Sequence, residues 1–128
     1  MLTSKFLIIN TRDELLRIDC SKIVYIESDG NLTKVILKNK IQLMVSMNLA
    51  NIQKFITTTL RDQASLFARI GKRHIINTTY ITQINLLRQS LMLSDGENFA
   101  FQLKPSKEAL KQLKSMLMKP VTNTNLNK

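Results

Sequence analysis

Short apolar runs separated by polar turn residues make up most of this chain. The runs are rich in isoleucine, valine, leucine and aromatic residues, which favour β-strands. Asp29-Gly30 and Asp95-Gly96 have the composition of tight hairpin turns, because glycine readily adopts the positive backbone angles that such turns require. The pattern predicts ten strands, at residues 6–9, 15–18, 23–27, 32–37, 41–45, 66–70, 74–76, 81–87, 90–93 and 98–103.

Two segments have helical spacing instead. The apolar side of the first consists of Leu49, Ile52, Ile56 and Leu60. Either Ser46 or Asn48 can cap its start, because both side chains accept hydrogen bonds from backbone amides. The second helix opens at residues 105–108 (PSKE), and proline fits a first helical turn without the loss of a hydrogen bond. Its apolar side consists of Ala109, Leu110, Leu113 and Leu117.

The length of 128 residues suits one domain with a single core. We expect a mostly β domain over residues 1–119, with one short central helix and a C-terminal helix, followed by a polar, disordered tail at 120–128. No stretch approaches the roughly 18 apolar residues of a membrane span, and the N-terminus does not resemble a signal peptide. We therefore expect a cytoplasmic protein with no membrane contact. Cys20, the single cysteine, lies between apolar runs and is expected to be packed.

The chain is strongly basic, with 19 Lys and Arg against 9 Asp and Glu, a formal charge of +10 and a pI near 10.1. Such an excess attracts polyanions and speeds encounters with them, although it carries no information about the fold. A basic surface kept for solubility is the simpler explanation. For a domain this basic, however, nucleic acid is the favoured partner.

The most informative segment is FARIGKRHIIN, at residues 67–77. Two strand-like runs flank Gly71-Lys72-Arg73-His74, which places cations at a predicted loop tip. A basic tip held by strands suits a nucleic-acid groove, because phosphates supply most of the attraction and base edges lie just beyond them. The two predicted helices are too far apart for a helix-turn-helix, and the ligands of a zinc finger are missing. DNA binding would therefore use loops or strands.

Five segments, in their order and spacing, resemble the LytTR-type (LytR/AlgR family) DNA-binding domain of bacterial transcription regulators. They are IVYIESDGN at 23–31, FARIGKRHIIN at 67–77, YITQIN at 80–85, SLMLSDGENFAF at 90–101 and LKPSKEALKQLK at 103–114. In that family the domain often follows a receiver domain as the output of a response regulator. The resemblance covers roughly residues 5–118 of this chain.

The resemblance implies an elongated arrangement of small antiparallel sheets that inserts loops into successive major grooves of double-stranded DNA, usually at paired repeats. It also implies three contact segments: the loop after Glu27, the loop Gly71-Lys72-Arg73 (hereafter the basic loop), and the start of the last helix. The DNA-binding residues are then Asn31, Thr33, Lys34, Lys72, Arg73, Ser106 and Lys107.

Three positions of the basic loop depart from the family pattern. Gly71 stands where many members have histidine, Lys72 where arginine is common, and Arg73 where a small serine is usual. Arginine can pair with guanine through two hydrogen bonds, whereas lysine offers a point charge. General attraction to DNA should survive these changes, but the base preference of this loop is expected to differ from that of typical members.

Several neighbouring side chains have structural explanations. Arg69 is expected to pair with an internal carboxylate such as Glu27. His74, the only histidine, is expected to pack or to face a phosphate rather than to bind a metal, and Asn77 to fix the following turn.

Other apolar and basic residues also have simple explanations. Tyr25 and Phe55 lie in apolar patterns and are expected in the core. Helical spacing would place four lysines on one face, which an ordinary solvated surface explains as well as DNA contact does. These lysines are Lys104, Lys107, Lys111 and Lys114.

The sequence has no nucleophile, metal or nucleotide-binding motif, so we expect no enzyme activity, no metal and no cofactor. The hypothesis is a sequence-specific regulator that binds double-stranded DNA, with a second protomer beside it. The few residues before the first strand leave no room for a receiver domain, so we expect a standalone regulator, an excised domain, or a protein that takes its signal from a separate sensor or receiver.

Two alternatives remain at the level of sequence. The first is a protein-interaction module that keeps the fold but has lost specific DNA reading, for which the glycine in the basic loop is the main argument. The second is an RNA-binding β module, which would need exposed aromatic side chains. Aromatic residues make up only 5% of the chain and lie mostly in core-like positions.

Overall fold

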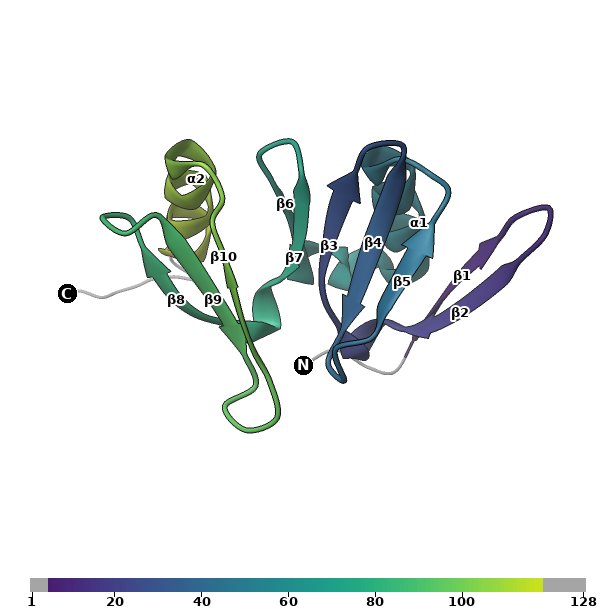
Figure 1. Ribbon diagram of the computed structural model, residues 1–128, viewed down its shortest axis with the longest axis horizontal. Helices are drawn as coiled ribbons and strands as arrows, with labels where there is room; N and C mark the ends of the chain where they lie inside the picture. The colour runs from purple at the N-terminus through teal and green to yellow at the C-terminus, as the bar shows by residue number, and fades with distance from the viewer. Residues whose placement is uncertain (1–4, 119–128) are drawn as a thin grey trace.

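The computed structural model describes residues 5–118. Within this range ten strands form three antiparallel sheets, accompanied by two α-helices and three short 3-10 helices (Figure 1). The strands are β1 (Phe6–Asn10), β2 (Leu15–Asp19), β3 (Ile23–Asp29), β4 (Leu32–Leu37), β5 (Gln42–Val45), β6 (Phe67–Ile70), β7 (His74–Asn77), β8 (Ile81–Asn85), β9 (Ser90–Ser94) and β10 (Ala100–Leu103). The α-helices are α1 (Leu49–Leu60) and α2 (Lys107–Met118), and the 3-10 helices are η1 (Cys20–Lys22), η2 (Arg61–Leu66) and η3 (Thr78–Tyr80). The three sheets follow one another along the long axis of the molecule, which confirms the mostly β, elongated architecture.

The five-stranded sheet, in the order β5-β4-β3-β7-β6, forms the centre of the molecule. One of its faces is covered by α1 and by the inner side of the β1–β2 hairpin. The Asn48 side chain accepts a hydrogen bond from the backbone amide of Asn51 at 2.8 Å, so it is the cap that starts α1. The core on this side includes Ile26 of β3 together with Ile52 and Ile56 of α1. The four predicted apolar positions of α1 are all buried.

The opposite face of the central sheet packs against α2 and the sheet β10-β9-β8. A register shift in β3 between Ile23 and Tyr25 lets Val24 and Tyr25 both join this second core. The ring of Tyr25 meets that of Phe101 edge-on, with 5.6 Å between centroids. Leu110 of α2 is fully buried in the same core. The central sheet is therefore fixed on both faces, and the loops at its edge have a rigid support.

The structure corrects three details of the sequence prediction. Phe55 is 36% exposed, because it lies beside rather than within the buried stripe of α1. Leu117 is 47% exposed, and the buried residues of α2 end at Leu113. Strand β8 ends at Asn85 and not at Leu87. The expected tail at 120–128 and the domain boundary at 119 lie outside the described residues, and no helix within 5–118 is long and apolar enough to cross a membrane.

Candidate nucleic-acid interface

The basic loop, residues 71–73, connects β6 to β7 at the upper edge of the central sheet (Figure 1). At the end of β3, the backbone amide of Ser28 donates a hydrogen bond to the carbonyl of Arg73 at 2.9 Å. Arg69 Nη2 donates to the carbonyl of Lys72 at 3.5 Å. These bonds tie the loop to its neighbouring strands, so the cations project from a defined position.

Gly71 brings the basic loop close to α2. Its φ of 55° lies in the left-handed region, which glycine adopts without strain. A methyl group at position 71 would lie 3.5 Å from the Cβ of Ala109, which is an ordinary contact distance. Backbone conformation, rather than a lack of space, therefore favours glycine at this position.

Gly71→Ala is expected to lower the free energy of unfolding by about 1 kcal/mol, because L-residues are strained in the left-handed region. DNA affinity should change little, because both cations of the loop remain. Urea denaturation monitored by circular dichroism would measure the difference. A variant as stable as the parent would contradict the conformational explanation.

Glu27, near the end of β3, faces three basic side chains. Its Oε2 lies 3.0 Å from Nε2 of His74 and 3.9 Å from Nη2 of Arg73, and its Oε1 lies 3.6 Å from Nζ of Lys34. The strand register causes this arrangement, because Lys34 on β4 and His74 on β7 both lie directly opposite Glu27. The side chains of Glu27 and His74 are 21% and 11% exposed, whereas that of Arg73 is 66% exposed. Glu27 and His74 thus form a largely enclosed pair, whereas Arg73 contacts Glu27 from the exposed side.

The expected ion pair between Arg69 and Glu27 is wrong. Strand β7 lies between β6 and β3, so Arg69 is not on a neighbouring strand of Glu27. Arg69 Nη1 instead donates to Oε1 of Gln53 on α1 at 3.3 Å. His74 packs as expected, and its partner is the carboxylate that had been assigned to Arg69.

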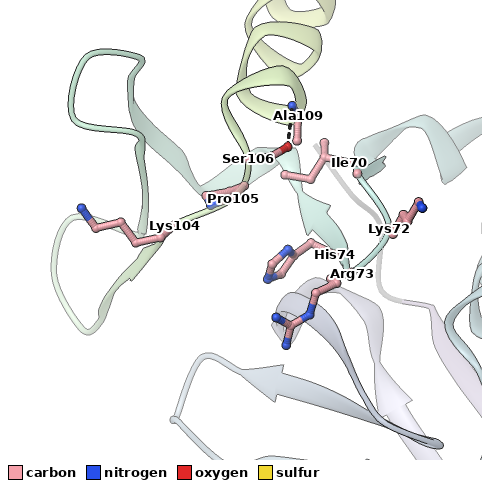
Figure 2. A pocket seen from close by; sticks show the side chains of 9 residues that line it. Ile70, Lys72, Arg73, His74, Lys104, Pro105, Ser106 and Ala109 are labelled. Carbon is pink, nitrogen blue, oxygen red and sulfur yellow. Dashed lines mark hydrogen bonds between the residues drawn. The ribbon is translucent and has the colours of Figure 1, made fainter.

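The start of α2 lies across a groove from the basic loop (Figure 2). Ser106 Oγ accepts a hydrogen bond from the backbone amide of Ala109 at 3.1 Å and so caps the helix. The groove has a volume of about 420 Å³ and is lined by residues 70–74 together with Lys104, Pro105, Ser106 and Ala109. In Figure 2, Lys104 and Lys72 lie at opposite ends of the groove, with His74 and Arg73 between them. The basic loop and the start of α2, which are distant in the sequence, therefore form one surface.

The predicted contact segment after Glu27 is divided between surface and interior. Asn31 is exposed in the turn between β3 and β4. Thr33 is fully buried, and its hydroxyl donates to the carbonyl of Met47 at 2.6 Å, so its side chain supports the fold and does not reach the surface. Lys34 is half-buried beside Glu27. Of the three predicted residues in this segment, only Asn31 is exposed.

Lys104 does not lie on α2, which begins at Lys107. It stands between β10 and α2, and its Nζ donates to the carbonyl of Arg88 at 3.3 Å. The prediction that Lys104 shares a helix face with Lys107, Lys111 and Lys114 is therefore wrong. Glu27 was expected to form an ion pair, but its actual partners His74 and Lys34 were missed, and no local signal in the sequence identifies them.

The remaining candidate residues have structural roles. Asn77 Nδ2 donates to the carbonyl of Ile23 at 2.8 Å and its Oδ1 accepts from the amide of Thr79 at 3.0 Å, which confirms that it fixes the turn. Cys20 is buried as predicted, and this burial raises the pKa of its thiol to about 11, so the thiol stays protonated at neutral pH. Among residues 5–118 no group of three or more His, Cys, Asp or Glu side chains could hold a metal ion.

Exposed cations on loops that a rigid sheet holds suit the binding of a polyanion such as a nucleic acid. Comparison with known families makes this specific: the sequence profile of the LytTr DNA-binding domain matches residues 13–118. The chain belongs to this family of DNA-binding regulatory domains. The chain is thus a DNA-binding regulatory domain, with DNA as its partner.

Two related proteins agree with this assignment. The heme-containing CO-sensing transcriptional regulator RcoM 2 of Paraburkholderia xenovorans (strain LB400) is 24% identical over 106 residues, which are 83% of this chain. The chain spans about 37% of the length of that regulator. The solved LytTr DNA-binding domain of a Bacillus cereus protein superposes with a TM-score of 0.59 at 19% identity, covering 91% of this chain and 99% of that domain. The latter likeness confirms the fold.

Proposed function

We propose that this domain binds specific DNA sequences by inserting the basic loop and the start of α2 into successive major grooves of one duplex. Two protomers would occupy paired promoter repeats side by side, as the hypothesis from the sequence expects. The β3–β4 turn would act as a third probe through Asn31. All three elements lie along the upper edge of the molecule in Figure 1.

The observation that carries this proposal is the shared groove between the basic loop and the start of α2. Lys72 and Lys107 are exposed, and within the described residues neither forms an ion pair. One rigid surface therefore presents Lys72 and Lys107, which are 35 positions apart in the sequence. Such a surface can hold the phosphates that flank a groove and bring side chains to the base edges.

Arg73 is the best candidate for reading bases. Its contact with Glu27 is long, at 3.9 Å, and its side chain is 66% exposed. Arg73 can therefore leave Glu27 and bind a base at little cost in free energy. A guanidinium can form two hydrogen bonds with O6 and N7 of guanine. Lys72 then holds a phosphate. Lys107 and the capped N-terminus of α2 hold another, because a helix N-terminus attracts negative charge.

Selection of bound duplexes from a random DNA pool tests the proposal. We expect a recovered motif with two similar half-sites about one helical turn, or a multiple of it, apart. A salt titration on the recovered duplex and on a scrambled duplex should show tighter binding of the former at every salt concentration. If both duplexes bind alike and both lose affinity steeply with salt, the attraction is charge alone and specific reading is refuted.

A further inference from the structure

Residues 86–89 form the turn between β8 and β9, hereafter the β8–β9 turn. Hydrogen bonds fix the backbone conformation of this turn. The backbone amide of Gln89 donates to the carbonyl of Leu86 at 3.2 Å. The amide of Arg88 donates to Oδ1 of Asn85 at 2.9 Å. The sequence pattern had predicted that the strand would continue through Leu87, and these bonds show why it does not.

The β8–β9 turn is also hydrogen-bonded to residues that line the groove between the basic loop and the start of α2. Gln89 Nε2 donates to the carbonyl of Pro105 at 3.1 Å, and Lys104 Nζ donates to the carbonyl of Arg88 at 3.3 Å. Both Lys104 and Pro105 line the groove opposite the basic loop. The turn is therefore the next surface element beyond the start of α2, at the left end of the molecule in Figure 1.

The tip of the turn presents an apolar side chain and a cation together. Leu87 is 94% exposed, more than any other large hydrophobic residue within 5–118. Arg88 is exposed, and no acidic side chain in the described part of the chain pairs with it. Single exposed leucines are common on protein surfaces, so exposure alone is a weak argument. This leucine, however, lies on a hydrogen-bonded turn that adjoins the groove.

Other cations surround the tip. Lys104 lies on one side, and on the other Leu86 shares a shallow hollow with Lys111 and Lys114 of α2. The acidic residue of this part of α2, Glu108, is 3.8 Å from Lys111. An apolar tip within a positive surface matches a duplex, where phosphates flank a minor groove with an apolar sugar wall. Leucine is among the side chains that DNA-binding proteins press into minor grooves to bend DNA.

We propose that the β8–β9 turn is a further DNA contact, outside the three segments assigned above. In this contact Arg88 binds a backbone phosphate, and Leu87 packs into the minor groove that flanks the major groove entered by α2. The DNA bends toward this end of the domain to reach the turn. The inference rests on the proposed function, because it requires the duplex to lie along the upper edge of the molecule.

The test compares duplex lengths and protein variants on one recovered DNA half-site. On a duplex with long flanks, Leu87→Ala/Arg88→Ala is expected to weaken binding by about 5- to 20-fold and to lower the slope of log affinity against log salt by about 0.9. On a duplex shortened at the flank beyond α2, the variant and the parent should bind equally. Fluorescence energy transfer between the duplex ends should report a smaller bend for the variant. Leu87 is exposed and the turn is held by backbone and Asn85 contacts, so the variant should fold.

Leu15→Ala/Lys54→Ala is the matched control. It also removes one exposed leucine and one cation, from β2 and α1 respectively, and should bind both duplexes as the parent does. Equal affinity and equal bending of the turn variant and the parent on the long duplex would overturn the inference. A loss that is the same on long and short duplexes would also overturn it. Lys72→Ala/Arg73→Ala, measured in parallel, shows whether the proposed function itself holds: if that variant loses affinity while the turn variant does not, only the further contact is refuted.

Discussion

Replacement of Lys72 and Arg73 by alanine is expected to reduce affinity for the selected duplex by about 10- to 100-fold. The loss of one base-reading arginine accounts for about 1–3 kcal/mol, and about 1.4 kcal/mol corresponds to tenfold in affinity. The loss of the phosphate contact proposed for Lys72 should also lower the slope of log affinity against log salt by about 0.9. Fluorescence anisotropy on selected and scrambled duplexes over a range of salt concentrations measures both quantities.

The control for this variant is Lys22→Ala/Lys54→Ala. Both lysines are exposed and lie outside the groove, on η1 and α1, so the control removes the same net charge from elsewhere on the surface. It should leave the preference for the selected duplex over the scrambled one intact, whereas the basic-loop variant should reduce it. Equal losses in the two variants would mean that the overall charge of +10, and not the basic loop, governs binding.

Glu27→Gln is expected to lower the free energy of unfolding by about 1.5–3 kcal/mol, the range for hydrogen bonds that involve a charged group. The reason is that the carboxylate accepts from Nε2 of His74 at 3.0 Å and also neutralises Lys34, in a site that is only 21% exposed. Loss of its charge also removes the long, 3.9 Å contact with Arg73 and makes the basic surface more positive by one unit. We therefore expect tighter binding to scrambled DNA and a smaller ratio of specific to non-specific affinity.

Urea denaturation and duplex titrations would separate these effects. Asp62→Asn removes one negative charge from an exposed position on η2 and serves as the comparison. It should change stability by less than about 0.5 kcal/mol, as surface substitutions generally do. If Glu27→Gln keeps both the stability and the specificity ratio of the parent, then Glu27 does not position the basic surface.

The sequence by itself determined the order of the strands and α-helices, but not the three 3-10 helices between them. Short apolar runs and Asp-Gly turns are local signals, so all ten strands could be predicted, with errors only at ends such as that of β8. The apolar stripe of α1 was an equally local signal, whereas the choice of Asn48 over Ser46 as its cap came from the structure. The basic loop and its likeness to LytTR domains also followed from the sequence, because the loop is a continuous segment.

Tertiary structure decided which side chains meet. Glu27 and His74 are 47 positions apart, and only the pairing of β3 with β7 makes them neighbours instead of Glu27 and Arg69. The sequence suggested that Thr33 lies at the surface. The central sheet is covered on both faces, however, so side chains that point to either face can be buried, and Thr33 is one of them.

The groove depended on tertiary structure in the same way, since the basic loop and the residues before α2 approach each other only after the two sheets pack. Local propensities act between residues a few positions apart, whereas strand register and sheet packing are set by contacts between distant segments. For this reason the sequence determined that the chain carries a basic loop on a β scaffold, and the tertiary structure decided what lies beneath that loop and beside it.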